Sequence, residues 1–150
     1  MTLSIRAATV ADLPAMMALE KRAATAAHWS AEQYEALFRA SDPDRVALIM
    51  REDSDLQGFV IARVLGEEWE IENIAVAGPA RRRGLGTRLL CELLDSARAK
   101  DAAAVFLEVR ESNQAARALY EKWAFRESGR RPRYYKHPAE DAILYRLDFI

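Results

Sequence analysis

Runs of apolar residues along the chain predict seven strands. Some runs alternate with polar residues, which is typical of strands with one buried face, and others are continuous, which is typical of buried strands. They lie at residues 3–8, 46–50, 56–65, 67–78, 101–109 and 141–149, with one more strand after the helical segment that ends near residue 125.

Apolar residues at helical spacing predict four helices. The first follows Thr9, a candidate N-cap, and the second follows Ser30, which pairs with Gln33 in a candidate capping box. The third spans residues 84–100 with a leucine-rich face, and the fourth spans residues 113–125. Strands that come first and then alternate with helices predict a mixed α/β sheet with helices on both faces.

Composition narrows the function classes. The chain has 150 residues, about one domain, and its net charge of −1 gives no general attraction to nucleic acid or an acidic membrane. A single cysteine, Cys91, excludes an internal disulfide, and the histidines, His28 and His137, lack metal-ligand spacing. We therefore expect no metal, no membrane and no direct nucleic-acid partner. Without a signal-peptide pattern or an apolar run of about 20 residues, the expected compartment is the cytoplasm.

The stretch VAGPARRRGLGTRLL, residues 76–90, places arginines and glycines just before the leucine-rich face. The first N–H groups of a helix have no internal partner and carry partial positive charge, and glycines let a ligand approach the backbone. The stretch predicts an anion-binding loop for a phosphate-rich ligand, with a solvated surface turn as the alternative. A Walker motif and a Rossmann fingerprint are excluded, because no lysine follows Gly86 and a third glycine is missing.

The segment RRRGLG, residues 81–86, matches the Arg/Gln-x-x-Gly-x-Gly/Ala signature and resembles the GNAT acetyltransferases. Three longer blocks, NIAVAGPARRRGLGTRLL, FLEVRESNQAARALYEKWAF and RRPRYYKHPAEDAILYRLDF, resemble the RimI type, the ribosomal-protein-alanine N-acetyltransferases. The resemblance implies one GNAT domain over residues 1–150, with a mixed seven-stranded sheet splayed between strands 4 and 5 and about four helices on its two faces.

In this family the pyrophosphate of acetyl-CoA lies on the signature loop, and its pantetheine lies along the preceding strand. The residues that the resemblance assigns to acetyl-CoA, the co-substrate, are Ile74, Ala75, Val76, Arg82, Arg83, Gly84, Leu85, Gly86 and Thr87. Strand N–H groups exposed by the splay would polarise the acetyl carbonyl, where negative charge develops during transfer. Asn113 matches a residue that contacts the cofactor, and it is equally a candidate N-cap for the helix that follows.

The resemblance assigns proton transfer to Glu108 and Tyr120. The amine must lose a proton before it attacks, and the leaving thiolate must gain one. Glu108 is a carboxylate on a largely apolar strand and matches the family's general base, acting directly or through water; a salt bridge near Arg110 is the alternative. Tyr120 matches the general acid for the coenzyme A sulfur; the alternative is a core tyrosine on an amphipathic helix.

The same residues bear on the substrate. Deprotonation at pH 7 costs about 1.4 kcal/mol for an α-amine and about 4.6 kcal/mol for a lysine amine, so one carboxylate suits the α-amine. Tyr134 and Tyr135 resemble the tyrosine pair that holds a peptide backbone in N-terminal acetyltransferases; hairpin packing is the alternative. We expect transfer to a protein N-terminus, with the N-terminal alanine of the eighteenth small-subunit ribosomal protein favoured. A small-amine or antibiotic acetyltransferase and a non-catalytic acyl-CoA-binding sensor are the alternatives.

Two positions depart from the family pattern. Ala124 stands where the family often has glycine before phenylalanine, and a positive φ there would strain the turn by about 1 kcal/mol. His28 stands where the family often has proline before Trp-Ser, which puts the substrate loop in question.

Overall fold

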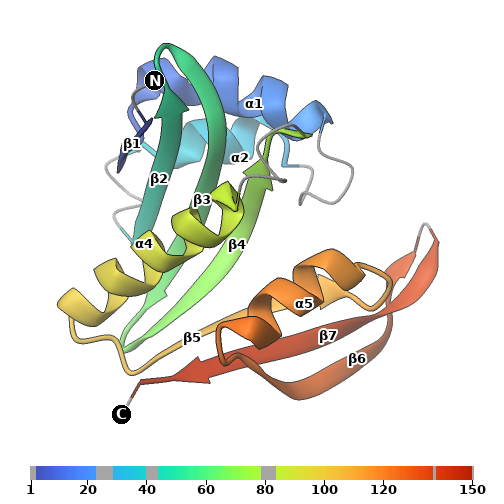
Figure 1. Ribbon diagram of the computed structural model, residues 1–150. Coiled ribbons are helices and arrows are strands. Elements are labelled where there is room, and N and C mark those ends of the chain that lie inside the picture. The colour runs from blue at the N-terminus through green and yellow to red at the C-terminus, as the bar shows by residue number, and fades with distance from the viewer. Residues whose placement is uncertain (1–2, 23–28, 40–43, 79–83, 137, 150) are drawn as a thin grey trace.

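The chain is described by a computed structural model over residues 3–22, 29–39, 44–78, 84–136 and 138–149 (Figure 1). Its strands are β1 (Leu3–Ala7), β2 (Arg45–Glu52), β3 (Asp55–Leu65), β4 (Glu68–Val76), β5 (Ala104–Arg110), β6 (Arg126–Lys136) and β7 (Ala139–Asp148). Its helices are the 3₁₀ turn η1 (Val10–Asp12), α1 (Leu13–Arg22), α2 (Ala31–Ala36), α4 (Leu85–Ala99) and α5 (Gln114–Lys122). The seven predicted strands and the four predicted α-helices are all present, with ends shifted by a few residues.

The strands form one seven-stranded sheet in the order β1-β2-β3-β4-β5-β7-β6. All neighbours are antiparallel except β4 and β5, which run parallel. β4 pairs with β5 only from Glu68 to Ile71, after which β4 follows β3 to Val76 and β5 follows β7 to Arg110. The two strands therefore diverge (Figure 1), and the predicted splay between strands 4 and 5 is confirmed.

Helices cover both faces of the sheet, as predicted. α4 and α5 lie on one face, and α1 and α2 lie on the other (Figure 1). The residues of α4 that the structure buries are those of the predicted face: Leu85, Leu89, Leu90, Leu93, Leu94 and Ala97. Because each fully buried leucine contributes about 1.5–3 kcal/mol, this face holds α4 firmly on the strands. The start of α4 is thereby fixed beside the end of β4.

Both predicted helix starts are confirmed, although α1 is preceded by a short 3₁₀ turn. The Ser30 amide donates to Gln33 Oε1 (2.8 Å), and the Gln33 amide donates to Ser30 Oγ (3.2 Å), which completes the capping box. At the other start, the Thr9 amide donates to Asp12 Oδ2 (2.7 Å).

Asp12 is a buried carboxylate held by two arginines from neighbouring strands. Its oxygens lie 2.9 Å from Arg6 Nη1 and 3.2 Å from Arg51 Nη1. The hydrogen bonds from Arg6 are the main reason why the pKa of Asp12 is lowered to about 2. This cluster ties β1 and β2 to the start of α1.

The turn after α5 has the backbone conformation that favours glycine. Ala124 has a φ of 72°, while the Phe125 amide closes the turn by donating to the Tyr120 carbonyl (3.0 Å). The positive φ that was considered from the sequence is therefore present, and alanine bears its steric strain.

Candidate active site

A cavity of about 1040 Å³ lies where β4 and β5 diverge. Its walls come from β4, β5, α5 and the β6–β7 hairpin. Trp29, just before α2, completes them. The site residues predicted from the sequence that line it are Ile74, Glu108, Asn113, Tyr120, Tyr134 and Tyr135. The splay thus gathers residues from four separate parts of the chain.

Glu108 stands on β5, where Val105, Leu107 and Val109 are buried on the opposite face. Its side chain is 18% exposed, and its Oε1 lies 3.0 Å from Nε of Arg131 on β6. The salt bridge considered from the sequence therefore exists, but its partner is Arg131 rather than the neighbourhood of Arg110.

Tyr120 on α5 is 3% exposed, and its ring packs on Phe125 (5.5 Å between centroids) and Tyr145 (6.3 Å). Within the described residues its hydroxyl has no hydrogen-bond partner. Burial raises the pKa of Tyr120 above its ordinary value of 10.0, so the hydroxyl carries its proton at neutral pH. Tyr120 is thus both a core residue and part of the cavity wall.

Three further carboxylates line the cavity and were missed from the sequence: Glu70 and Glu72 on β4, and Glu140 on β7. Glu72 Oε1 pairs with Arg45 Nε at 2.6 Å, whereas Glu70 has no ion pair within the described residues. Burial raises the pKa of Glu70, and the charges on Glu72 and Glu108 raise it further. The alternation that singled out Glu108 on β5 is also present in EWEIEN and could have indicated Glu70 and Glu72.

Tyr134 and Tyr135 form an edge-to-face pair on the β6–β7 hairpin, with ring centroids 5.3 Å apart. Arg110 stacks on Tyr135 (4.1 Å) and Arg131 lies over Tyr134 (5.4 Å). Tyr134 is 48% exposed, and burial followed by the Glu108 charge raises the pKa of Tyr135. The pair therefore packs in the hairpin and also faces the cavity, so the two interpretations of the sequence are compatible.

Asn113 is the N-cap of α5, because its Oδ1 accepts from the Ala116 amide at 3.2 Å. It also lines the cavity. The capping role is thus present, and the position leaves room for a ligand contact.

The start of α4, where the sequence predicts an anion-binding loop, lies beyond the cavity lining. Gly84 is its N-cap with a φ of 71°, and no acidic side chain occupies the first turn. A Cβ on Gly86 would lie 3.4 Å from Val76 Cγ2, so Gly86 lets the helix approach β4 closely.

The other residues assigned to acetyl-CoA are found as follows. Leu85 and Thr87 lie in the first turn of α4, and Ala75 is buried on the α1 side of β4. Arg82 and Arg83 lie outside the described residues.

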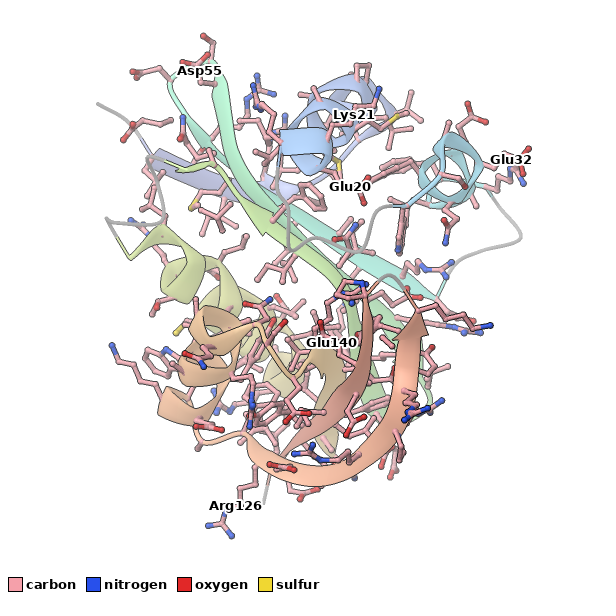
Figure 2. The ribbon with its side chains drawn as sticks, turned by 90° about the vertical axis from the view of Figure 1, so that its right-hand side faces the viewer. Glu20, Lys21, Glu32, Asp55, Arg126 and Glu140 are labelled. Carbon is pink, nitrogen blue, oxygen red and sulfur yellow. The ribbon has the colours of Figure 1, made fainter. Side chains whose placement is uncertain are left out.

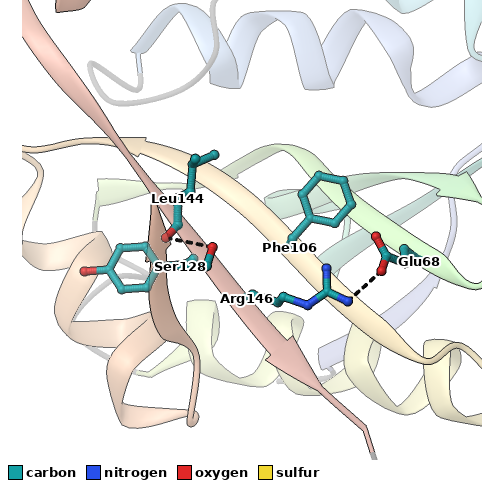
Figure 3. Close-up of a pocket in the computed structure, with 6 residues that line it drawn as sticks. Glu68, Phe106, Ser128, Leu144 and Arg146 are labelled. Carbon is teal, nitrogen blue, oxygen red and sulfur yellow. Dashed lines mark hydrogen bonds and ion pairs between the residues drawn. The ribbon is translucent and has the colours of Figure 1, made fainter. Parts of the chain in front are cut away.

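A second pocket, of about 150 Å³, is lined by Glu68, Phe106, Ser128, Leu144, Tyr145 and Arg146 (Figure 3). It includes the ion pair between Arg146 and Glu68 and a bond from Ser128 to the Leu144 carbonyl. None of the predicted site residues lines it. Among the residues that the structure describes, no group of three or more His, Cys, Asp or Glu side chains could hold a metal ion. No helix in the same part of the chain is long and apolar enough to cross a bilayer.

A sheet that splays after its fourth strand and meets a glycine turn at the next helix defines an acyl-CoA acetyltransferase fold. The model of the acetyltransferase (GNAT) family matches residues 13–125, and the chain belongs to this family. Acetyltransferases of this family use acetyl-CoA.

Two kinds of comparison place the chain near one type of GNAT enzyme. It is 39% identical over 149 residues to the ribosomal protein bS18-alanine N-acetyltransferase of Salmonella typhimurium, covering 97% of this chain and 96% of that protein. The Escherichia coli protein of the same name is 37% identical over 139 residues, or 91% and 90% of the two chains. The crystal structure of the ribosomal-protein-S18-alanine N-acetyltransferase from Escherichia coli superposes with a TM-score of 0.88 at 32% identity, covering 98% and 94%.

Proposed function

We propose that the chain, acting as one domain over residues 1–150, transfers the acetyl group of acetyl-CoA to the N-terminal α-amine of a protein. Its favoured substrate is ribosomal protein bS18 with an N-terminal alanine, the reaction for which the two bacterial relatives are named. The observation that carries the proposal is the cavity at the splay, whose walls include both Glu108 and Tyr120. The cytoplasm is the expected compartment, with no metal, membrane or direct nucleic-acid partner.

The residues at the end of β4 and the start of α4 fit acetyl-CoA. The amides of Gly84, Leu85, Gly86 and Thr87 stand at a helix N-terminus that suits a pyrophosphate, with Arg82 and Arg83 assigned there by resemblance. The pairing of β4 with β5 ends at Ile71, so the part of β4 beyond it borders the cavity and suits the pantetheine, and Asn113 stands at the cavity wall. When bound, acetyl-CoA supplies an acetyl group activated as a thioester.

Glu108 and Tyr120 then move the two protons. The charged Glu108 carboxylate accepts a proton from the substrate ammonium, directly or through water, which frees the amine lone pair. Tyr120 keeps its hydroxyl proton through neutral pH and donates it to the departing sulfur. Tyr134 and Tyr135, at the mouth of the cavity, hold the backbone of the peptide.

Mass spectrometry of peptides tests the proposal directly. The protein is incubated with acetyl-CoA and short peptides that differ in their first residue, alongside free polyamines and aminoglycosides. We expect a gain of one acetyl group on the α-amine, fastest for an N-terminal alanine. Turnover of the small amines alone would contradict a peptide substrate, and binding of acetyl-CoA without any transfer would indicate a sensor.

A further inference from the structure

Glu20 on α1 is a carboxylate buried to 4% exposure on the side of the helix that faces the sheet (Figure 2). No lysine or arginine among the described residues forms an ion pair with it. Burying a carboxylate without a cation costs free energy unless hydrogen bonds compensate. Its Oε1 accepts from the Trp29 amide at 2.6 Å and from Asn73 Nδ2 at 3.1 Å. One oxygen therefore joins two segments that are far apart in the chain.

Asn73 stands where β4 leaves β5. The β3–β4 register shifts opposite this point, since Ile61 pairs with Asn73 and Ala62 pairs with Ile71, which leaves Glu72 as an extra residue. Ile71 is also the last residue of β4 that pairs with β5. Asn73 Nδ2 donates to the hydroxyl of Tyr34 (3.2 Å) as well as to Glu20, so the side chain just past the bulge is fixed to α1 and α2.

Trp29 is the second residue that Glu20 holds, and like Asn73 it lines the cavity. Its ring packs on Tyr34 (5.4 Å between centroids). The guanidinium carbon of Arg45, which pairs with Glu72, lies 5.8 Å from the centroid of the Trp29 ring. The ring is thus held by neighbours, while its backbone is held by Glu20.

We propose that Glu20 is a positioning residue for the amine substrate: it fixes Trp29 against the bulge of β4 and so shapes the cavity wall that the peptide meets. This rests on the proposed function. The donors that Glu20 binds, which are the Trp29 amide, Asn73 Nδ2 and the Tyr34 hydroxyl, are all neutral, so the wall needs an acceptor at this point and not a charge. Glu20 lies on the α1 side of the sheet, whereas the start of α4 lies on the other side, so the pyrophosphate end of acetyl-CoA is bound away from it.

Steady-state kinetics with acetyl-CoA and an alanine-initiated peptide test the proposal in Glu20→Ala, Glu20→Gln and Tyr34→Phe. We expect Glu20→Ala to raise the peptide KM about tenfold or more, since the acceptor of the Trp29 amide and of Asn73 is lost, and to change the Kd of acetyl-CoA much less. Glu20→Gln keeps the accepting oxygen and keeps the wild-type KM. Tyr34→Phe removes one acceptor of Asn73 and the hydroxyl that hydrogen-bonds Glu20, and it should raise the peptide KM about threefold. It takes the place of Glu20→Ala in the test if that variant does not fold. Glu92→Ala, an exposed glutamate on α4, is the matched control.

Amide exchange of Trp29, followed by NMR, gives a readout independent of activity. Its N–H should exchange slowly in the wild type and in Glu20→Gln, and rapidly in Glu20→Ala. An unchanged peptide KM in both Glu20→Ala and Tyr34→Phe overturns the proposal, and so does a Glu20→Gln variant as impaired as Glu20→Ala, because charge would then be the requirement. A wild-type protein that acetylates no peptide is a different failure, that of the proposed function itself.

Discussion

Arg131 on β6 reaches past β7 to hold Glu108 on β5, with 3.0 Å between Nε and Oε1. The guanidinium is 55% exposed and the carboxylate 18% exposed, so water weakens this pair. In the proposed mechanism the same carboxylate must accept a proton from the amine. The ion pair therefore competes with the substrate for Glu108.

Replacing Arg131 by glutamine should raise kcat/KM for the peptide. A partly exposed ion pair contributes at most about 1 kcal/mol, so the gain should be no more than about fivefold, and it should shrink as salt screens the pair. Initial rates at low and high ionic strength measure it. Arg126→Gln removes the same charge from an exposed position on β6 and is the matched control. Equal effects of the two substitutions would show that only net charge matters.

Glu108→Gln should lower kcat about 100-fold or more, because the amide keeps the shape of the carboxylate but cannot accept the proton. The Kd of acetyl-CoA, measured by calorimetry, should stay at the wild-type value. Glu67→Gln, in the exposed turn before β4, controls for the loss of one carboxylate. A Glu108→Gln variant with normal kcat would remove Glu108 from the mechanism.

Tyr120→Phe should also lower kcat about 100-fold while leaving the binding of acetyl-CoA intact. Burial raises the pKa of Tyr120 above 10.0, so its proton is present at every pH below that value. The wild-type kcat should therefore show no fall from tyrosine ionisation up to about pH 10. A pH profile of both proteins checks this. An alkaline fall near pH 8 that disappears in Tyr120→Phe would contradict the raised pKa.

The local pattern of apolar and polar residues was sufficient to predict the helices and strands and the orientation of Glu108 in the site. The leucine spacing of α4 predicted its buried face, and alternation on β5 predicted that Glu108 would face away from Val105 and Leu107. The partner of Glu108 could not be predicted in this way. Arg131 reaches it only because β7 inserts between β5 and β6, and Arg110, the expected neighbour, instead contacts Glu140 and the ring of Tyr135.

Glu20 was missed although the chain carries a signal for it. Leu13, Met16 and Glu20 are spaced by three and then four residues, so Glu20 falls on the apolar face of α1. A carboxylate in that position needs a partner. One of its partners, Asn73, lies on a strand more than 50 residues later in the chain. A local sequence pattern cannot predict a contact between residues so far apart.

The lowered pKa of Asp12 makes the free energy of unfolding depend on pH. Its pKa is lowered to about 2 in the folded chain against 3.8 as the ordinary value, chiefly by hydrogen bonds from Arg6. The native state thus favours the charged form, and this contribution, about 2 kcal/mol, is complete above pH 4 and is lost as the pH falls from 4 toward 2.

Urea unfolding of wild type and Asp12→Asn should show this dependence. The variant should be less stable by about 2 kcal/mol at pH 7, and the difference should shrink steadily below pH 4. Asp95→Asn, which alters a carboxylate that is 71% exposed, should change little at either pH. A constant difference between wild type and Asp12→Asn from pH 7 to pH 3 would show that the charge of Asp12 is not what stabilises the fold.

Ala124→Gly should stabilise the protein by about 1 kcal/mol, because the φ of 72° strains a residue that has a Cβ. The greater freedom of glycine in the unfolded chain offsets part of this gain. Ala118→Gly, at an exposed position inside α5, should instead destabilise by about 0.5–1 kcal/mol, since there the helix loses an alanine of ordinary conformation. Thermal unfolding of the two variants should therefore shift the midpoint in opposite directions. A lower midpoint for both would mean that the turn after α5 does not carry the strain that its backbone implies.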